Sequence, residues 1–356
     1  MYPTVENKSF GIFVKNQVEA LKSRGLSVDV AAITNPHSGK FNVLKKYSAW
    51  MMGTLKAFMT KGRKYHIVHA HYVFPSGLLG YLFKKCFGTR FIVTAHGGDI
   101  DKMARRSARL FNWTKKILHE ADHVIAVGNE LYETIVNEFE VPCENISIIN
   151  MGVNREIFKP INKGEARASC DLDPSIIPIL FVGNIIKQKG LMELLGAFSQ
   201  LVRMQPAIRL YLIGPQKDQA FMQELQELTN EHGIQGHVSF LGTKDQREIA
   251  QWMAAAELFV LPSHIEGFGL VALEAMACGT PVVGTDVGGL KYLLADNAGK
   301  TVPPLDSKAL ESAISQLLSD RNQCEILIQN GEKRAEENDQ ERMLDLVMDV
   351  YFPTGG

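Results

Sequence analysis

Two glutamates, Glu266 and Glu274, are the side chains of this sequence best placed to do chemistry. Glu266 stands in a glycine-flanked loop, and Glu274 lies inside the uninterrupted apolar segment 270–277. A helix that is apolar on every side is buried, and an ionised carboxylate buried there without partners costs several kcal/mol or becomes protonated. We therefore expect Glu274 to meet hydrogen-bond donors. These could be the two hydroxyls of a ribose or, equally, a buried lysine or backbone amides.

The loop Gly267-Phe268-Gly269 between the two glutamates suits an anionic ligand. Its glycines let the backbone approach a ligand closely, and a helix that begins near Leu270 directs free N–H groups and a partial positive charge toward it. Lys189, next to Gly190, could add a full positive charge. Taken alone, Lys189 would be a solvated lysine at the start of a helix. Together these residues predict a site for a diphosphate.

Short β-branched runs alternate with amphipathic segments along the whole chain, which is typical of βαβ repetition. These runs lie at residues 28–34, 67–70, 91–95, 123–127, 146–149, 179–182, 210–213, 238–241, 258–261 and 281–284. A polar stretch with three prolines at residues 154–178 interrupts them. The pattern predicts two parallel-sheet domains with helices on both faces of each sheet, joined near residue 155.

Ligands of such sheets bind at the carboxyl ends of the strands, so the loops there should hold the chemistry. The informative loops are Ala95-His96-Gly97-Gly98-Asp99, residues 182–190, Ile213-Gly214-Pro215 and residues 262–269. None has the glycine spacing of a dinucleotide-binding or Walker loop, which disfavours NAD and P-loop nucleotide sites.

Size and composition are those of an ordinary globular protein. The chain has 356 residues, more than one hydrophobic core usually supports, with 46% hydrophobic and 22% charged residues. The longest uncharged run, residues 65–83, contains three histidines and a proline, so we expect no membrane-spanning helix. Five scattered cysteines and the lack of a secretory signal indicate a cytoplasmic location.

Charge is unevenly distributed. Residues 1–157 contain 21 Lys and Arg against 13 Asp and Glu, whereas residues 158–356 contain 17 against 26. Between Lys40 and Lys116 there are 16 basic residues and only Asp99 and Asp101, which implies an anionic partner.

The segment from Glu266 through Glu274 to Val283 resembles the Glu-x7-Glu signature of retaining glycosyltransferases of family 4, which have the GT-B fold. Matches elsewhere extend the resemblance over nearly the whole chain. They are Val182-Gly183-Asn184 with Lys189-Gly190, Thr94-Ala95-His96-Gly97, and Tyr2-Pro3-Thr4 with Gly11. The resemblance implies two Rossmann-like domains facing a cleft: an acceptor-side domain at residues 1–155, a donor domain at 156–335 and a C-terminal helix at 336–356 that returns to the first domain.

The resemblance also implies roles for particular residues. Glu274 would bind the ribose hydroxyls of a nucleotide sugar, Lys189 would neutralise the leaving diphosphate, and His96 would contact the donor sugar near the reacting carbon. Glu266 would meet the donor sugar, and Glu266, His96 and Lys189 form the expected catalytic set. The expected donor-binding set is Gly11, Asn184, Gly214, Gly267, Phe268, Gly269, Leu270 and Glu274.

The implied reaction keeps the configuration of the sugar. In this family the acceptor attacks on the face from which the leaving group departs, and a phosphate oxygen takes the proton, so we assign no enzymic nucleophile, no metal and no cofactor. UDP is the expected nucleotide on family frequency, and a lipid-linked or cell-envelope glycan is the expected acceptor. Two alternatives stay open: a GT-B nucleotide-sugar epimerase, and a non-catalytic protein that binds nucleotide sugars. A two-carboxylate hydrolase is disfavoured.

The sequence departs from the family pattern at two places. Position 184 is Asn where the family usually has Arg, and Lys187 could compensate for the missing cation. The chain begins at Met1-Tyr2-Pro3, so the strand that precedes this segment in the family is expected to be missing.

Within the basic stretch 40–116, residues 102–116 mix cations with Leu, Phe and Trp at helical spacing, as interfacial helices do, and residues 43–59 have a similar mixture. For each helix alone, a solvated helix packed on its domain explains the sequence as well. The summed charge favours an anionic membrane surface or a polyanionic acceptor, and no recognition motif supports nucleic acid. His69 and His71 are expected to pack or anchor a loop, and Asp99-Ile100-Asp101 is not expected to bind metal.

Overall fold

The computed structural model describes residues 2–3, 11–34 and 40–353. Thr4, which belongs to the resemblance above, lies outside them, as does part of the segment before Gly11. The chain forms two compact units: residues 1–151 with 341–356, and residues 152–340. Each is described below by itself.

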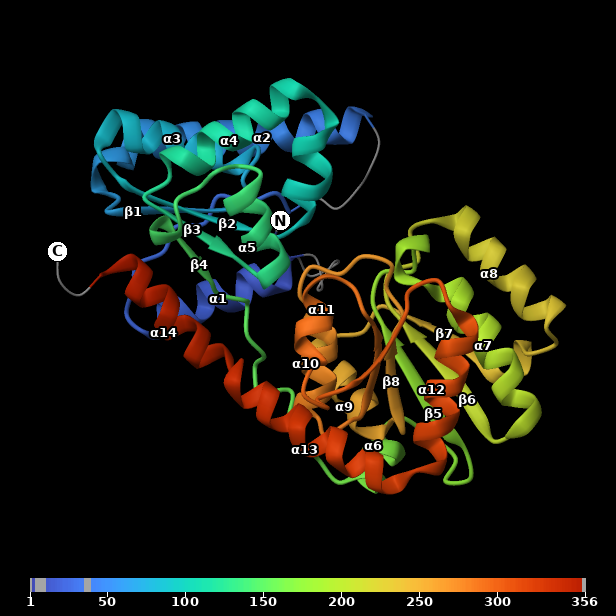
Figure 1. Cartoon of the computed structure of the whole chain (residues 1–356). Coiled ribbons are helices and arrows are strands. Elements are labelled where there is room, and N and C mark those ends of the chain that lie inside the picture. The colour runs from blue at the N-terminus through green and yellow to red at the C-terminus, as the bar shows by residue number, and fades with distance from the viewer. Residues whose placement is uncertain (1, 4–10, 35–39, 354–356) are drawn as a thin grey trace. The chain divides into compact units, whose positions relative to one another are not determined.

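The sheet of the first unit is parallel, with the order β1-β2-β3-β4 (Figure 1). Its strands are β1 (Ile67–His71), β2 (Arg90–Ala95), β3 (His123–Ala126) and β4 (Ile146–Ile148). Ile67 pairs with Arg90 and Ile92 with His123, so the carboxyl ends of β1 and β2 meet at one edge. This edge carries the loop that contains His96.

Helices cover both faces of this sheet because neighbouring strand residues point to opposite sides. Phe91 and Val93 belong to the core beneath α3 (Ser76–Phe87) and α4 (Ala108–Glu120), whereas Ile92 packs with Leu21 and Leu344. The remaining helices of the unit are α1 (Ile12–Ser23), α2 (Lys40–Lys61), α5 (Asn129–Asn137) and α14 (Gln340–Tyr351). The last helix of the chain is therefore part of the first core.

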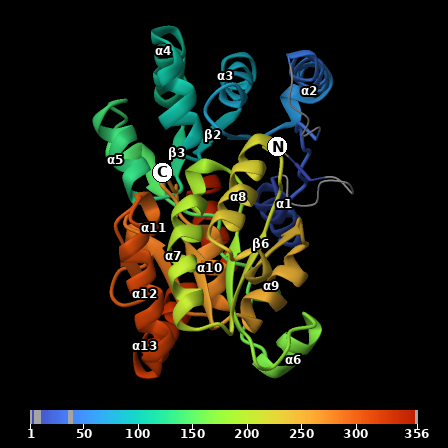
Figure 2. The ribbon, with the colours of Figure 1, turned by 90° about the vertical axis from the view of Figure 1, so that its right-hand side faces the viewer.

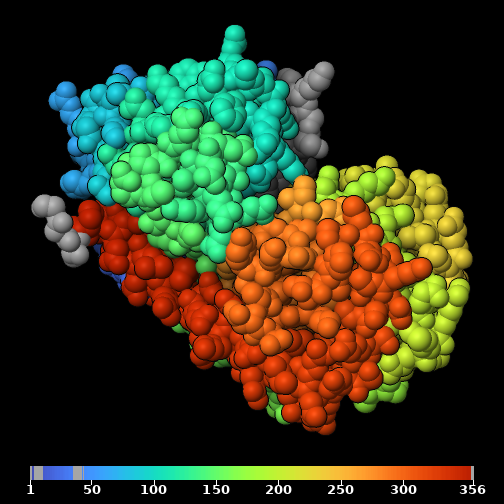
Figure 3. All heavy atoms as spheres, in the orientation of Figure 1, coloured from blue at the N-terminus to red at the C-terminus, as the bar shows by residue number. Residues whose placement is uncertain are grey.

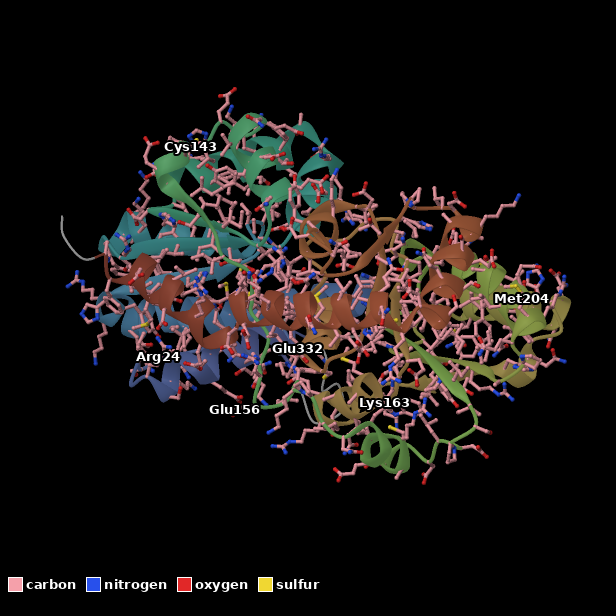
Figure 4. All side chains as sticks on the ribbon, turned by 60° about the horizontal axis from the view of Figure 1, so that its bottom comes forward. Arg24, Cys143, Glu156, Lys163, Met204 and Glu332 are labelled. Atoms are coloured by element: carbon pink, nitrogen blue, oxygen red, sulfur yellow. The ribbon has the colours of Figure 1, made fainter. Side chains whose placement is uncertain are left out.

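An ion-pair cluster also attaches α14 to the first unit. Arg24, which follows α1 and is labelled in Figure 4, donates to the carboxylates of Glu341 and Asp345 on α14. Tyr351, at the end of the same helix, is 6% exposed within the core. Both ends of α14 are thus held against residues that lie more than 280 positions earlier in the sequence.

The strand predicted at residues 28–34 is wrong. The segment is irregular, Val30 is 42% exposed, and among the described residues its backbone bond to another segment is from Tyr2 N–H to the Ile33 carbonyl, 3.0 Å. Among the described residues β1 stands at the edge of the sheet, so residues 28–34 have no paired neighbour. A β-branched composition favours a strand only where a neighbouring strand and a covered face complete it.

The second unit has a six-stranded parallel sheet with the order β10-β9-β8-β5-β6-β7. The strands are β5 (Ile177–Val182), β6 (Ile208–Ile213), β7 (Val238–Gly242), β8 (Leu258–Leu261), β9 (Val282–Thr285) and β10 (Lys300–Val302). Every residue of β8 and β9 is buried, and Thr285, whose hydroxyl donates to the Ser263 carbonyl, is the one polar side chain in these two strands. Figure 3 shows the orange and red surface that residues from about 250 onward form on this unit.

Eight helices described in this unit surround the sheet. They are α6 (Lys163–Ser169), α7 (Leu191–Met204), α8 (Gln219–Glu231), α9 (Gln246–Ala255), α10 (Leu270–Ala277), α11 (Gly288–Leu293), α12 (Ser307–Ser319) and α13 (Arg321–Glu337). Aspartates start several of them; Asp245, for example, forms a capping box with Glu248 at α9. The sequence analysis did not predict β10 or α6. None of the described helices is long and apolar enough to cross a membrane.

Glycines at the carboxyl edge of the second sheet allow strands and loops to meet backbone to backbone. A Cβ atom on Gly214, which follows β6, would lie 1.8 Å from the carbonyl oxygen of Gly183, and the φ angle of Gly214 is 152°. Gly214 N–H also donates to the Gly242 carbonyl at 2.8 Å. No side chain fits at this position.

We predict that Gly214→Ala destabilises the protein by about 2–4 kcal/mol, because backbone rather than a side chain must move to admit the methyl group. The matched control is Gly236→Ala, since a Cβ there meets nothing within 4 Å; its effect should stay within about 0.5 kcal/mol. Urea unfolding of both variants provides the measurement. Equal stabilities would show that the contact between Gly214 and Gly183 is not a constraint.

Candidate functional site

The loops after β5 and β8 meet through their backbones. Gly190 has a φ of 69°, and a Cβ atom on it would lie 1.9 Å from the carbonyl oxygen of Pro262. His264 N–H donates to the Gln188 carbonyl across the same contact at 2.9 Å. The residue before Gly190 is therefore held beside the loop 262–269.

That residue is Lys189, and it pairs with Glu266. The distance from Lys189 Nζ to Glu266 Oε2 is 2.6 Å, and the side chains are 18% and 15% exposed. Ser263 Oγ donates to the same carboxylate oxygen at 3.2 Å. The structure thus brings together two of the three residues of the expected catalytic set, and adds Ser263, which sequence analysis missed. An ion pair this far from water leaves a poorly compensated charge when either partner is removed.

The glycine loop ends at the start of α10. Gly269, with a φ of 90°, is the N-cap residue, and the N–H groups of Leu270 and Val271 have no acceptor among the described residues. A Cβ on Gly289 would lie 2.3 Å from the Gly267 carbonyl oxygen, so this glycine, also missed from the sequence, holds the loop in place. Free N–H groups and the helix dipole at this end of α10 favour an anion.

Glu274 lies on α10 and is 8% exposed. Its burial raises the pKa to about 8. In the part of the chain that the structure describes, no protein group forms a hydrogen bond or ion pair with its carboxylate. Among the described residues, neither a buried lysine nor a backbone amide is therefore the partner of this carboxylate.

The other donor-side positions surround the same edge. Asn184 is exposed after β5, Gly214 lies against Gly183, and Phe268 is half-buried between the two loop glycines. Lys187 does not take the place of the missing arginine here: its Nζ is 2.8 Å from Glu224 of α8 and 6.0 Å from the centre of the Phe221 ring. Lys189 is thus the cation that the structure places beside Glu266.

His96, the third residue of the expected catalytic set, lies in the first unit after β2. Its Nε2 is 3.1 Å from His71 Nδ1, and the two rings are stacked with their centroids 5.3 Å apart. Burial lowers the pKa of His96 to about 3 and that of His71 well below its ordinary value. His96 is therefore a neutral imidazole whose orientation His71 helps to fix. Gly11, also in this unit, is buried and caps α1 with a φ of 72°.

Asp99 anchors the loop that carries His96. Its carboxylate accepts hydrogen bonds from His96 N–H at 3.0 Å and from Val73 N–H at 2.8 Å, so it joins the loops after β1 and β2. The sequence signal was an acidic residue three positions after His96, from which a carboxylate can reach back to the His96 N–H as in a capping box. Asp101 is exposed and makes no such bonds.

His69 anchors the sheet, as predicted. Its Nδ1 is 2.6 Å from Tyr351 Oη, and its Nε2 is 2.7 Å from Thr94 Oγ1. Both ring nitrogens are therefore used in hydrogen bonds between β1, β2 and α14. No group of three or more His, Cys, Asp or Glu within the described residues is arranged to hold a metal ion.

We predict that Asp99→Ala destabilises the protein by about 2–4 kcal/mol, because it leaves two buried N–H groups without acceptors. Asp101→Ala, two residues away, should change the stability by less than about 0.5 kcal/mol. Urea unfolding distinguishes the two variants. Equal losses would contradict the anchoring role and would favour a joint role for both aspartates.

We also predict that Glu274 makes the ligand-free protein less stable as pH rises. The folded state keeps a proton on this carboxyl up to about pH 8, whereas the unfolded chain loses it near the ordinary value of 4.5. Its contribution is complete below pH 4.5 and is lost toward pH 8. Glu274→Gln should therefore gain stability relative to the wild type as pH rises, measured by urea unfolding at several pH values. Parallel pH profiles would contradict a buried, protonated carboxyl.

Two family models match the chain in succession. The model described as "Glycosyltransferase Family 4" matches residues 11–157, and the model described as "Glycosyl transferases group 1" matches residues 163–334. A D-inositol 3-phosphate glycosyltransferase from Thermobispora bispora is 32% identical over 300 residues, which cover 78% of this chain and 68% of the relative.

Solved structures show the same architecture. A sucrose-phosphate synthase from Thermosynechococcus elongatus is 27% identical, with a TM-score of 0.80 over 96% of this chain and 92% of that chain. Anabaena HepE in complex with UDP and glucose is 21% identical, with a TM-score of 0.76 over 94% and 88% of the two chains. The chain therefore belongs to the family 4 glycosyltransferases, and its two parallel-sheet units are those of the GT-B fold.

Proposed function

We propose that the protein is a retaining, metal-independent glycosyltransferase that moves a sugar from a nucleoside diphosphate to an anionic acceptor. The observation that carries this proposal is the buried pair of Lys189 and Glu266 in the second unit, whose loop leads to the free N–H groups at the start of α10. A cation and a helix N-terminus are the groups that stabilise a departing diphosphate. The order of loops, glycines and carboxylates agrees with membership of the family.

Each of these groups would bind a different part of the nucleotide-sugar donor. Glu274 would accept hydrogen bonds from the ribose hydroxyls, and this is supported by the lack of a protein partner for its carboxylate among the described residues. The backbone from Gly267 to Leu270 and the Lys189 ammonium would hold the diphosphate. UDP is the proposed nucleotide: the structural likeness to HepE, which was crystallised with UDP, supports it together with its frequency in the family.

The mechanism follows from the charges that develop on the diphosphate and on the sugar in the transition state. When the bond between the anomeric carbon and the diphosphate oxygen breaks, that oxygen gains negative charge and the sugar gains oxocarbenium character. Lys189 and the α10 N-terminus would stabilise the first change, and neutral His96 would hydrogen-bond the sugar without adding positive charge beside the cationic carbon. The acceptor oxygen would then attack on the face that the diphosphate leaves, and a phosphate oxygen would take its proton. Glu266 would orient Lys189 and the sugar rather than form a covalent bond.

The acceptor would be a lipid-linked or cell-envelope glycan that carries negative charge. The excess of 14 positive charges between residues 40 and 116 supports an anionic acceptor or the anionic membrane surface on which it lies. The relative from Thermobispora bispora, named for inositol 3-phosphate, has a phosphorylated acceptor, and the same charge would suit such a molecule.

We predict that purified protein releases UDP from a UDP-sugar and that Lys189→Gln lowers kcat by about 100-fold or more, since it removes the fixed charge on the leaving group. Lys187→Gln is the matched control and should change kcat less than about threefold, because Lys187 is held by Glu224. Activity should persist in EDTA, and proton NMR of the product should show the anomeric configuration of the donor.

Other results would identify the alternatives. Inversion of configuration, or loss of activity in EDTA, would contradict the proposed mechanism. Nucleotide-sugar binding without turnover on any acceptor would favour the non-catalytic binding protein, and release of UDP with an epimerised free sugar would favour the epimerase.

A further inference from the structure

Helix α2 exposes a concentration of large apolar side chains. Leu44, Met51, Met52, Leu55 and Met59 are between 50% and 76% exposed, and they make up five of the 17 exposed large hydrophobic residues in the described part of the chain. Single exposed apolar residues need no explanation, whereas a contiguous group marks an interaction site.

These five side chains form one stripe. The helix turns by about 100° per residue, so positions 44, 51, 55 and 59 lie along one side, where exposed Ser48 separates Leu44 from the others, and Met52 lies beside them. Lys45 and Lys56 lie next to this stripe on the helix surface and are exposed. The arrangement is an apolar strip bordered by cations, and we call it the α2 stripe.

The adjoining side of α2 is held against the rest of the first unit. The Phe58 ring lies 5.1 Å from that of Phe83 and 4.7 Å from that of Phe87 on α3, measured between centroids. Thr54 is buried, and Trp50 Nε1 donates to the Ala31 carbonyl at 3.1 Å. Because these contacts fix which side of the helix faces inward, the α2 stripe is presented outward by the fold.

Neighbouring helices extend the surface. Helices α2, α3 and α4 lie side by side over one face of the first sheet (Figures 1 and 2). Leu82 on α3 and Trp113 on α4 are also exposed, 41% and 37%, and Lys116 Nζ is 5.3 Å from the centre of the Trp113 ring. An exposed tryptophan beside lysines is typical of side chains that sit among lipid headgroups.

The positive charge around the α2 stripe indicates which partner binds this surface. Residues 40–64 contain seven lysines and arginines and no acidic residue. Basic groups next to an anionic membrane each add about 1 kcal/mol of attraction, and an apolar strip adds a hydrophobic contribution when it enters the headgroup region. We propose that α2 is a membrane-contact helix: it lies in the plane of an anionic bilayer with the α2 stripe inserted among the lipids.

This inference rests on the proposed function only in one respect: membrane binding would bring the protein to a lipid-linked acceptor. Its test needs no donor and no acceptor. The full-length protein is centrifuged with vesicles of equal parts phosphatidylcholine and phosphatidylglycerol, and with vesicles of phosphatidylcholine alone, at low and high salt. A nucleotide-sugar assay on the same samples reports on the proposed function separately.

The apolar variant combines Met52→Gln, Leu55→Gln and Met59→Gln, and its control is Met204→Gln, an equally exposed methionine on α7 that is labelled in Figure 4. The charge variant combines Lys45→Gln and Lys56→Gln, and its control combines Lys308→Gln and Lys333→Gln, two exposed lysines of the second unit. All these side chains are exposed, so the variants should melt like the wild type.

The wild type should sediment with anionic vesicles at low salt and far less with neutral ones. The apolar variant should bind about tenfold more weakly, the charge variant about fivefold more weakly for each lysine, and the controls as the wild type does. Failure of the wild type to bind anionic vesicles, or unchanged binding by both α2 variants, would overturn the proposal. So would a wild-type dimer in solution that the apolar variant turns into a monomer, since the α2 stripe would then meet a second copy.

Discussion

The candidate site depends on one constraint: backbone meets backbone at the carboxyl edge of the six-stranded sheet. Gly190 against Pro262, Gly214 against Gly183 and Gly289 against Gly267 each leave no room for a Cβ atom. These contacts bind the loops after β5, β6, β8 and β9 into one rigid layer. Lys189 is placed beside Glu266 because its neighbour Gly190 is pressed against Pro262, and the start of α10 is exposed because Gly267 is fixed by Gly289. Groups that are far apart in the sequence, such as Lys189 and Glu266, are thereby held in a fixed geometry that flexible loops could not provide.

The electrostatics of this layer fit a ligand that brings both negative charge and hydroxyl groups. Lys189 pairs with Glu266, burial raises the pKa of Glu274 to about 8, and within the part of the chain that the structure describes neither Glu274 nor the first N–H groups of α10 have hydrogen-bond partners. A diphosphate would satisfy the N–H groups and share Lys189, and a vicinal diol would donate hydrogen bonds to Glu274. In the first unit, burial lowers the pKa of His71 and His96, which keeps both rings neutral, and Asp99 joins the loops that follow β1 and β2.

Much of the fold and of the candidate site could be predicted from the sequence because the apolar strands and the glycine-rich loops are local signals. Two parallel sheets, the start of α10 and the burial of Glu274 follow from patterns a few residues long. The strand prediction that failed depended on a pairing partner: residues 28–34 look like a strand but have no paired neighbour among the described residues. Two other side chains have partners that the sequence did not indicate, since Lys187 pairs with Glu224 and the Asp99 carboxylate accepts hydrogen bonds from two loop amides. The roles of Ser263 and Gly289 come from residues 3 and 22 positions away, and no spacing rule reveals them.

Nucleotide binding at the Glu274 position tests the central claim most directly. Thermal unfolding would be followed with UDP, GDP, ADP and CMP for the wild type, for Glu274→Ala and for Glu231→Ala, which removes an exposed glutamate of the same unit. At a 100-fold excess over Kd, a ligand that binds only folded protein adds about 2.7 kcal/mol of stability. The account predicts a rise in midpoint with one nucleoside diphosphate for the wild type and Glu231→Ala, and none for Glu274→Ala. An equal rise in all three proteins would contradict a ribose site at Glu274, and no rise in the wild type with any nucleotide would contradict the donor site itself.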